Sequence, residues 1–302
     1  MSSPFNTVEE ALTAIREGAM VVVVDDDDRE NEGDLIMAAS KATPEQVAFM
    51  IRHTSGILCA PIFEDQAKRL HLDPMVARND APMSTAFTVS IDYKEGLTTG
   101  ISAEERAATV QALTSSNVAA EDFVRPGHIF PLVARQGGVL MRSGHTEAGT
   151  DLAALAGLPP VGLLAELVND DGTVQRLPQL IEFAAQHELK IISIADLIAY
   201  RQMREQLVER TMEFEVNTRI GTARAIAYRT EFEEAEHIAL VFGDIGPSMP
   251  VRIHREKLLD DVFGSQTHHP QNLLDVSLDR IDKLGSGVLI YLRSGSVGVP
   301  LE

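Results

Sequence analysis

The chain has 302 residues and a formal net charge of −19 at pH 7, with 44% hydrophobic and 24% charged residues. This length and composition are typical of a globular protein with one large or two ordinary domains, and they exclude a fibrous or disordered chain. The excess of acids disfavours nucleic-acid binding, because phosphate backbones are contacted through Lys and Arg.

The N-terminal segment predicts a helix and not a targeting signal. It lacks the basic start and apolar centre of a signal peptide, and no apolar run reaches the roughly 18 residues that a membrane-spanning helix needs. Thr7 and Glu10 have capping-box spacing, and Gly18 gives a stop. We expect a cytoplasmic protein without a membrane partner.

Residues 20–34 form the centre of the predicted site. Four valines after Met20 predict a strand buried on both faces, and the strand leads into an acid-rich turn. A solvated acidic turn is the simplest interpretation of acids alone. Arg29 and Glu30 are adjacent, however, and Gly33 can bend the backbone, so one turn can present a phosphate-binding guanidinium and a metal-binding carboxylate. This combination fits a phosphorylated, metal-chelating small molecule.

The next part of the chain predicts alternating strands and helices. We expect strands over residues 35–39 and 57–60. Between them a helix is opened by Thr43, with Gln46 at the capping-box position, and closed at Gly56. Cys59 lies in an apolar string and is expected to be a buried structural thiol. As the only cysteine it excludes an internal disulfide and a zinc site built from several thiolates.

Periodicity then fails over residues 65–84, which predict a long irregular loop of the kind that often serves as a functional lid. A strand over residues 88–92 follows, and then a helix that Ser102 and Glu105 cap and that runs to about Leu113.

Two further motifs carry candidate functional residues. Residues 125–128 predict a loop that ends in His128, and a lone histidine is usually structural. A strand from Val139 is expected to end in a turn from Arg142 to Thr146, with Thr146 capping the next helix. The positive end of a helix binds phosphate, and Arg142 would add a guanidinium there, although an ordinary strand-to-helix turn is the alternative.

Glu166 stands inside an apolar strand, either as an edge residue facing water or as a carboxylate held for chemistry. Later residues continue the pattern with a helix, a strand and a helix whose polar end marks a domain boundary, giving domains 1–205 and 206–302. The second domain predicts strands at 214–216, 223–228, 237–242 and 288–292. The predicted fold is therefore α/β: a mixed sheet with helices on its faces, followed by a small β-rich domain.

These motifs resemble the 3,4-dihydroxy-2-butanone 4-phosphate synthase family of riboflavin biosynthesis. The resemblance covers about residues 5–203, through DDRENEGDL at 27–35, TTGISAEERA at 98–107, RPGHIFPL at 125–132, RSGHTEAGTDLAALAGL at 142–158 and AEL at 165–167. It implies conversion of D-ribulose 5-phosphate to L-3,4-dihydroxy-2-butanone 4-phosphate and formate by a homodimer that uses Mg²⁺ or Mn²⁺. The metal ligands it implies are Glu30 and His145, and the catalytic pair it implies is His128 and Glu166, to which the chemistry below adds Asp34. The substrate contacts it implies are Arg29, Glu30, Asp34, Arg142, Ser143, Gly144, His145, Thr146 and Glu166.

The chemistry requires these residue types. A ketose phosphate that loses one carbon passes through enediolates, whose charge a divalent ion can stabilise. Proton transfers need tunable acid–base groups, and we place Glu166 and Asp34 nearest to them with His128 in support. The residue that makes the first abstraction stays open.

The tail resembles the start of GTP cyclohydrolase II, through VRIHREKLLDDVFGS at 251–265 and VLIYLRSG at 288–295. That family holds zinc with three cysteines, whereas the matching positions here are Lys257, His268 and Pro270. Lysine and proline cannot ligate zinc. We therefore expect a truncated, degenerate domain without zinc or cyclohydrolase activity.

Three hypotheses follow from these resemblances. The first is a monofunctional synthase with a decayed second domain, the second is a bifunctional enzyme that still opens GTP, and the third is a non-catalytic partner of other flavin enzymes.

Overall fold

The computed structural model describes residues 4–26, 28–230, 235–264 and 272–293, and the chain divides into two units, Met1–Arg204 and Glu205–Glu302. Each unit contains one mixed sheet with helices, so the predicted α/β class is confirmed. No helix in the described ranges is both long and apolar enough to cross a bilayer.

The first unit is built on a seven-stranded sheet with the order β4-β5-β3-β6-β2-β1-β7. β1 is parallel to β7 but antiparallel to β2, and β2 is antiparallel to β6. The strands are β1 (Val21–Val24), β2 (Gly33–Ala38), β3 (Cys59–Ile62), β4 (Ile91–Tyr93), β5 (Phe123–Val133), β6 (Gly162–Glu166) and β7 (Lys190–Ser193).

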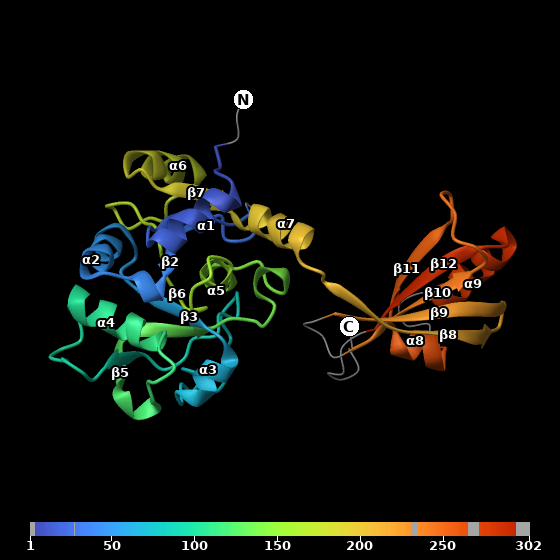
Figure 1. The fold of residues 1–302 in the computed structure, drawn as a ribbon, viewed down its shortest axis with the longest axis horizontal. Coiled ribbons are helices and arrows are strands. Elements are labelled where there is room, and N and C mark those ends of the chain that lie inside the picture. The colour runs from blue at the N-terminus through green and yellow to red at the C-terminus, as the bar shows by residue number, and fades with distance from the viewer. Residues whose placement is uncertain (1–3, 27, 231–234, 265–271, 294–302) are drawn as a thin grey trace. The chain divides into compact units, whose positions relative to one another are not determined.

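Helices cover both faces of this sheet (Figure 1), which explains why the valine strand has no polar alternation. Val22 and Val24 pack on one side with α2, α4 and α6, whereas Val21 and Val23 pack on the other side with α1, α5 and α7. The helices are α1 (Val8–Glu17), α2 (Pro44–His53), α3 (Glu64–Arg69), α4 (Ala103–Leu113), α5 (His145–Leu155), α6 (Leu177–Gln186) and α7 (Ile194–Arg204).

The capping residues in the sequence predicted where three helices begin. The capping boxes expected at the starts of α1, α2 and α4 are all formed, and Gly18 ends α1 in the left-handed conformation. α2, however, ends at His53 and not at Gly56.

Several other expectations are wrong in ways that affect the site. The loop expected over 65–84 contains most of α3, and residues 125–128 belong to β5 instead of a loop. The strand expected from Val139 is a short 3₁₀ turn, η3 (Gly138–Leu140). Two glycines with positive φ, Gly137 at 91° and Gly138 at 60°, explain this turn, because most residues avoid that conformation.

The second unit is a five-stranded sheet with the order β11-β12-β10-β9-β8, formed by β8 (Val208–Thr218), β9 (Gly221–Thr230), β10 (His237–Phe242), β11 (Val251–Arg255) and β12 (Gly287–Leu292). Two helices, α8 (Leu258–Phe263) and α9 (Leu273–Leu284), accompany the sheet. Leu278 and Ile281 of α9 pack on Leu289 and Phe242 to form its core.

Close packing of α5 on the sheet gives a test of the fold. A Cβ atom at Gly162 would lie 3.0 Å from the backbone of Gly149 in α5. We expect Gly162→Val to lower the free energy of unfolding by roughly 1–3 kcal/mol through overpacking, measured by urea denaturation. Gly246→Val is the matched control, since a Cβ atom there meets nothing within 4 Å. Equal stability of the two variants would contradict the packing.

Candidate active site

Asp25, the first residue after β1, organises the acid-rich turn. Its Oδ2 accepts hydrogen bonds from the backbone N–H of Glu30 (3.0 Å) and from Arg29 (2.8 Å), and its Oδ1 accepts from the N–H of Glu32 (2.9 Å). Burial alone would raise the pKa of Asp25, but the bonds from Glu32 and Arg29 hold it below its ordinary value. The Asp25 carboxylate therefore holds the acid-rich turn in place through these three hydrogen bonds.

His145, the first residue of α5, faces this turn. Its Nε2 lies 3.1 Å from the carbonyl oxygen of Val23, which can only accept, so Nε2 donates and Nδ1 keeps its lone pair. Nδ1 lies 3.9 Å from Glu30 Oε2 and 3.8 Å from Asp34 Oδ1. Burial lowers the pKa of His145, which favours the neutral, ligating form.

The donor set at this place fits a hard divalent cation. One ligand atom from each of Asp25, Glu30 and His145 lies within 4.8 Å of the others. Oδ1 of buried Asp34 has no hydrogen-bond partner among the described residues, although it faces the same space. Carboxylate oxygens and one imidazole, completed by water and substrate oxygens, suit Mg²⁺ or Mn²⁺.

Asp34 and Glu166 are direct neighbours on adjacent strands. Residues in register on β2 and β6 point to the same face, which brings the two carboxyl groups together. Burial raises the pKa of Asp34 well above its ordinary value, and the charges of Glu166 and Glu30 raise it further. Glu166 also accepts a 2.7 Å hydrogen bond from Ser55. One of this pair can therefore hold a proton while the other is charged.

A cationic corner lies beside the acids. A Cβ atom on Gly144 would come within 2.4 Å of Arg142 Nη1 and 3.1 Å of Arg29 Nη2, so both guanidinium groups crowd this glycine. Gly144, and not Thr146, is the N-cap of α5, and no side chain caps it. Two guanidinium groups beside an uncapped helix N-terminus form a site that suits a phosphate.

One pocket of about 110 Å³ lies between the acid-rich turn and the start of α5. Of the residues predicted from the sequence, Arg29, Glu30, Asp34, Arg142, His145, Thr146 and Glu166 line it. The lining also includes Glu32, Cys59, Thr85, Phe87, Leu132 and Leu164, which the sequence argument did not assign to a site. Cys59 is buried as expected. Thr85 and Phe87 lie just after residues 65–84, the segment predicted to be a functional loop. Their position beside that segment is the feature of the sequence that could have assigned them to the site.

Three of the predicted residues, His128, Ser143 and Gly144, are not among those that line this pocket. His128 lies at the same end of the sheet as Glu166, but β3 separates their strands, which corresponds to roughly 10 Å between the two backbones. Buried Asp92 fixes the His128 ring, with Oδ2 2.7 Å from Nδ1, and Oδ1 accepts from the His128 backbone N–H. The His128 side chain is 38% exposed, so the imidazole is oriented and accessible.

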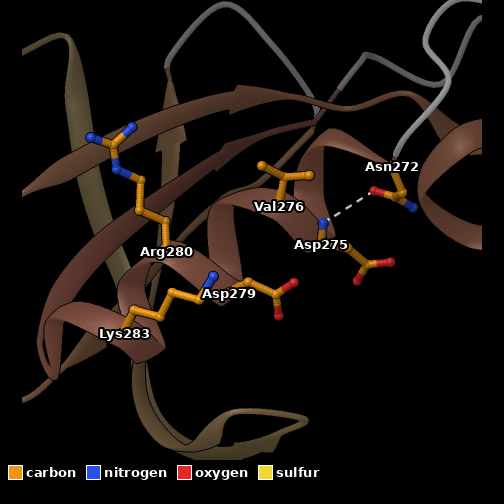
Figure 2. A pocket seen from close by; sticks show the side chains of 6 residues that line it. All are labelled: Asn272, Asp275, Val276, Asp279, Arg280 and Lys283. Carbon is orange, nitrogen blue, oxygen red and sulfur yellow. Dashed lines mark hydrogen bonds between the residues drawn. The ribbon is translucent and has the colours of Figure 1, made fainter.

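A broader depression of about 600 Å³ lies on α9 in the second unit (Figure 2). The side chains of Asp275 and Asp279 are paired with Arg219, and the Asn272 side chain caps the helix by accepting from the Asp275 N–H. The lining residues come from one helix and its cap, and they do not converge on a common point as those of the first pocket do. Size alone therefore does not identify the active site.

Comparisons with known proteins agree with the division into two units. The sequence profile of 3,4-dihydroxy-2-butanone 4-phosphate synthase matches residues 9–200, and that of GTP cyclohydrolase II matches residues 209–300. The first unit is thus a synthase-family domain fused to a domain of the cyclohydrolase family.

Individual relatives show the same arrangement. The chain is 53% identical to the bifunctional riboflavin biosynthesis protein RIBA 1, chloroplastic, of Arabidopsis thaliana, over 96% of this chain but only 54% of that protein, about half its length. It is 52% identical to the riboflavin biosynthesis protein RibBA of Salinispora arenicola, over 96% of this chain and 69% of that protein.

Two solved structures share the fold. The two-domain synthase RibBX of A. baumannii superposes with a TM-score of 0.82 at 40% identity and covers 98% of this chain and 83% of that one. A synthase in complex with two magnesium ions gives a TM-score of 0.64 at 41% identity, over 66% of this chain and 98% of that one. On the strength of these matches, the chain belongs to the 3,4-dihydroxy-2-butanone 4-phosphate synthase family.

Proposed function

We propose that the chain converts D-ribulose 5-phosphate to L-3,4-dihydroxy-2-butanone 4-phosphate and formate. The observation that carries the proposal is the meeting of two distant segments: the acid-rich turn with Arg29 and Glu30, and the start of α5 with Arg142 and His145, line one pocket with Glu166. A metal-binding set beside a cationic corner matches a substrate that has vicinal oxygens at one end and a phosphate at the other.

The metal-binding end consists of Glu30 and His145, with Asp25 close enough to contribute. A bound Mg²⁺ or Mn²⁺ ion would act as a Lewis acid toward the negative charge that develops on the substrate oxygens. The phosphate end consists of Arg29, Arg142 and the start of α5 at His145 and Thr146. These contacts orient the sugar so that its reacting carbons face Asp34 and Glu166.

Asp34 and Glu166 carry the proton transfers in this proposal. Their proximity and the burial of Asp34 favour a pair that shares one proton, so one carboxylate can accept a proton beside the carbonyl and the other can return one. Burial raises the pKa of Asp34 and favours its protonated form, so in this proposal Glu166 accepts the first proton and Asp34 returns one.

His128 needs a different explanation, because it does not line the pocket of its own chain. We propose that the active protein is a homodimer in which His128 of the partner subunit approaches the pocket. The exposed ring and its rigid Asp92 anchor support this, since an oriented histidine at a surface is suited to complete a site on a second copy.

The second unit is proposed to lack cyclohydrolase activity. Lys257, at a position where the cyclohydrolase resemblance requires a thiolate, stands at the N-cap of α8, and its backbone N–H donates to Asp261 at 2.9 Å. Its ammonium cannot ligate zinc. His268 and Pro270, the other two positions, lie outside the described residues. A bifunctional enzyme stays the second candidate because the Arabidopsis relative carries that name.

Loss of the metal ligands tests the synthase proposal. We expect Glu30→Ala and His145→Ala each to lower formate release from ribulose 5-phosphate by about a hundredfold or more, because charge on the substrate oxygens is then unstabilised. EDTA should abolish wild-type turnover and Mg²⁺ should restore it. Glu64→Ala, which removes an exposed carboxylate on α3, is the control and should be fully active. Wild-type turnover that persists in EDTA would refute the metal role.

Mixing of inactive variants tests the homodimer. Glu30→Ala and His128→Asn should each be inactive alone. Random exchange of their subunits should restore about a quarter of wild-type activity, because half of the dimers then contain one intact site out of two. Absence of any recovery, with subunit exchange verified by mass, would contradict a site that His128 of the partner subunit completes.

Metal analysis and a GTP assay test the second unit. Purified protein should contain less than about a tenth of a zinc ion per chain and release no formate from GTP, because lysine cannot replace a thiolate ligand. The same preparation should turn over ribulose 5-phosphate, which shows that it is folded. One zinc ion per chain together with GTP turnover would establish the bifunctional alternative.

A further inference from the structure

The segment that joins β5 to α5 is held in place by two buried carboxylates. Glu147 and Asp151 are four residues apart on α5, and they are 1% and 6% exposed. Glu147 accepts a hydrogen bond from the backbone N–H of Arg135 (3.0 Å) and another from the guanidinium of Arg142 (2.7 Å). Asp151 accepts from the backbone N–H of Val139 (2.9 Å). The two acids therefore fix the start, the middle and the end of this segment.

Each of these carboxylates is paired with an arginine. Glu147 pairs with Arg142, which the proposed function places at the substrate phosphate. Asp151 pairs with Arg201 of α7, whose Nη1 lies 2.8 Å from Oδ2. The same Nη1 donates to the carbonyl oxygen of Gly137 at 2.7 Å. Arg201 is 8% exposed, so it binds both the helix and the segment from inside the protein.

Gly138 connects this buried pair to Arg142. A Cβ atom on Gly138 would lie 1.9 Å from Asp151 Oδ1, so the turn rests directly on the carboxylate. The carbonyl oxygen of Gly138 accepts a hydrogen bond from the backbone N–H of Arg142 at 3.1 Å. A shift of Asp151 therefore moves Gly138, and a shift of Gly138 moves the backbone that carries Arg142.

We propose that Arg201 is a positioning residue for the sugar phosphate, which acts through Asp151 and the turn at Gly138 to hold Arg142 in place. The inference rests on the proposed function, in which Arg142 contacts the phosphate. The metal-binding end does not depend on this connection, because Glu30 comes from the turn after β1 and His145 is fixed by the carbonyl of Val23. Loss of Arg201 therefore weakens phosphate binding and leaves metal binding intact.

Arg201→Met tests this inference in the full-length protein. The KM for ribulose 5-phosphate and the inhibition constant of inorganic phosphate should both rise about tenfold, while kcat and the Mg²⁺ concentration for half-maximal activity change by less than about twofold. Arg201→Lys keeps a cation beside Asp151 and should recover most of the loss. In an Arg142→Ala background, Arg201→Met should add no further rise in KM beyond about twofold, because the two residues act through one contact.

Arg16→Met is the matched control. Arg16 of α1 also holds α5 by a backbone contact, since its Nε donates to the carbonyl oxygen of Ala156 at 3.1 Å, at the opposite end of the helix. If simple loosening of α5 raised KM, both variants would show the effect, whereas the inference predicts it for Arg201→Met alone. An equal effect in Arg16→Met would overturn the inference, and so would a wild-type KM in folded Arg201→Met.

Further variants keep the test decisive if Arg201→Met does not fold. Asp151→Asn keeps an acceptor for the Val139 N–H but removes the charge that holds Arg201, so it should raise KM about as much; wild-type values in Asp151→Asn would overturn the inference. If wild-type protein does not turn over ribulose 5-phosphate, the proposed function fails. Calorimetric binding of inorganic phosphate to wild type and to the variants then still decides the role of Arg201.

Discussion

The site is governed by the repulsion among carboxylates that the fold gathers at one end of a sheet. Asp34 is buried beside Glu166 and near Glu30, and its pKa is raised by burial and by these charges. Like charges at such distances are unfavourable unless a cation or a proton intervenes. The protein supplies part of the compensation through Arg29, which contacts both Asp25 and Glu30 at 2.8 Å. Burial lowers the pKa of His145, which disfavours a compensating positive charge on its ring, so the remaining repulsion makes this place suited to a cation.

Topology explains why residues more than a hundred positions apart reach this place. The antiparallel pairing of β1 with β2 returns the chain at the acid-rich turn, and β6 places Glu166 next to Asp34. α5 can lie close to the sheet because Gly149 meets Gly162 without intervening side chains. The N-terminus of α5 is therefore brought over the same sheet edge, and His145 contacts the Val23 carbonyl.

Local signals in the sequence predicted the elements that local interactions determine, such as the capping boxes and the doubly buried valine strand. These local signals gave wrong predictions where the backbone N–H groups of a strand bond to side chains that are distant in the sequence. Pro126 suggested a loop, since proline cannot donate to a ladder. In the structure the N–H of Gly127 donates to the Ser90 side chain and that of His128 to Asp92, so β5 continues through the interruption. Asp25 was missed because spacing cannot show which acid of a run accepts the backbone N–H groups.

The second unit contains a network of hydrogen bonds that joins one of its helices to the sheet. His254 and Asp261 remain buried, with Nε2 3.0 Å from the carboxylate, and Tyr291 donates to the same carboxylate at 2.8 Å. These contacts join β11, α8 and β12 through protein groups alone, and the backbone N–H of Lys257 adds to them. The hydrogen bonds at Asp261 therefore hold α8 against the sheet through groups of the protein itself.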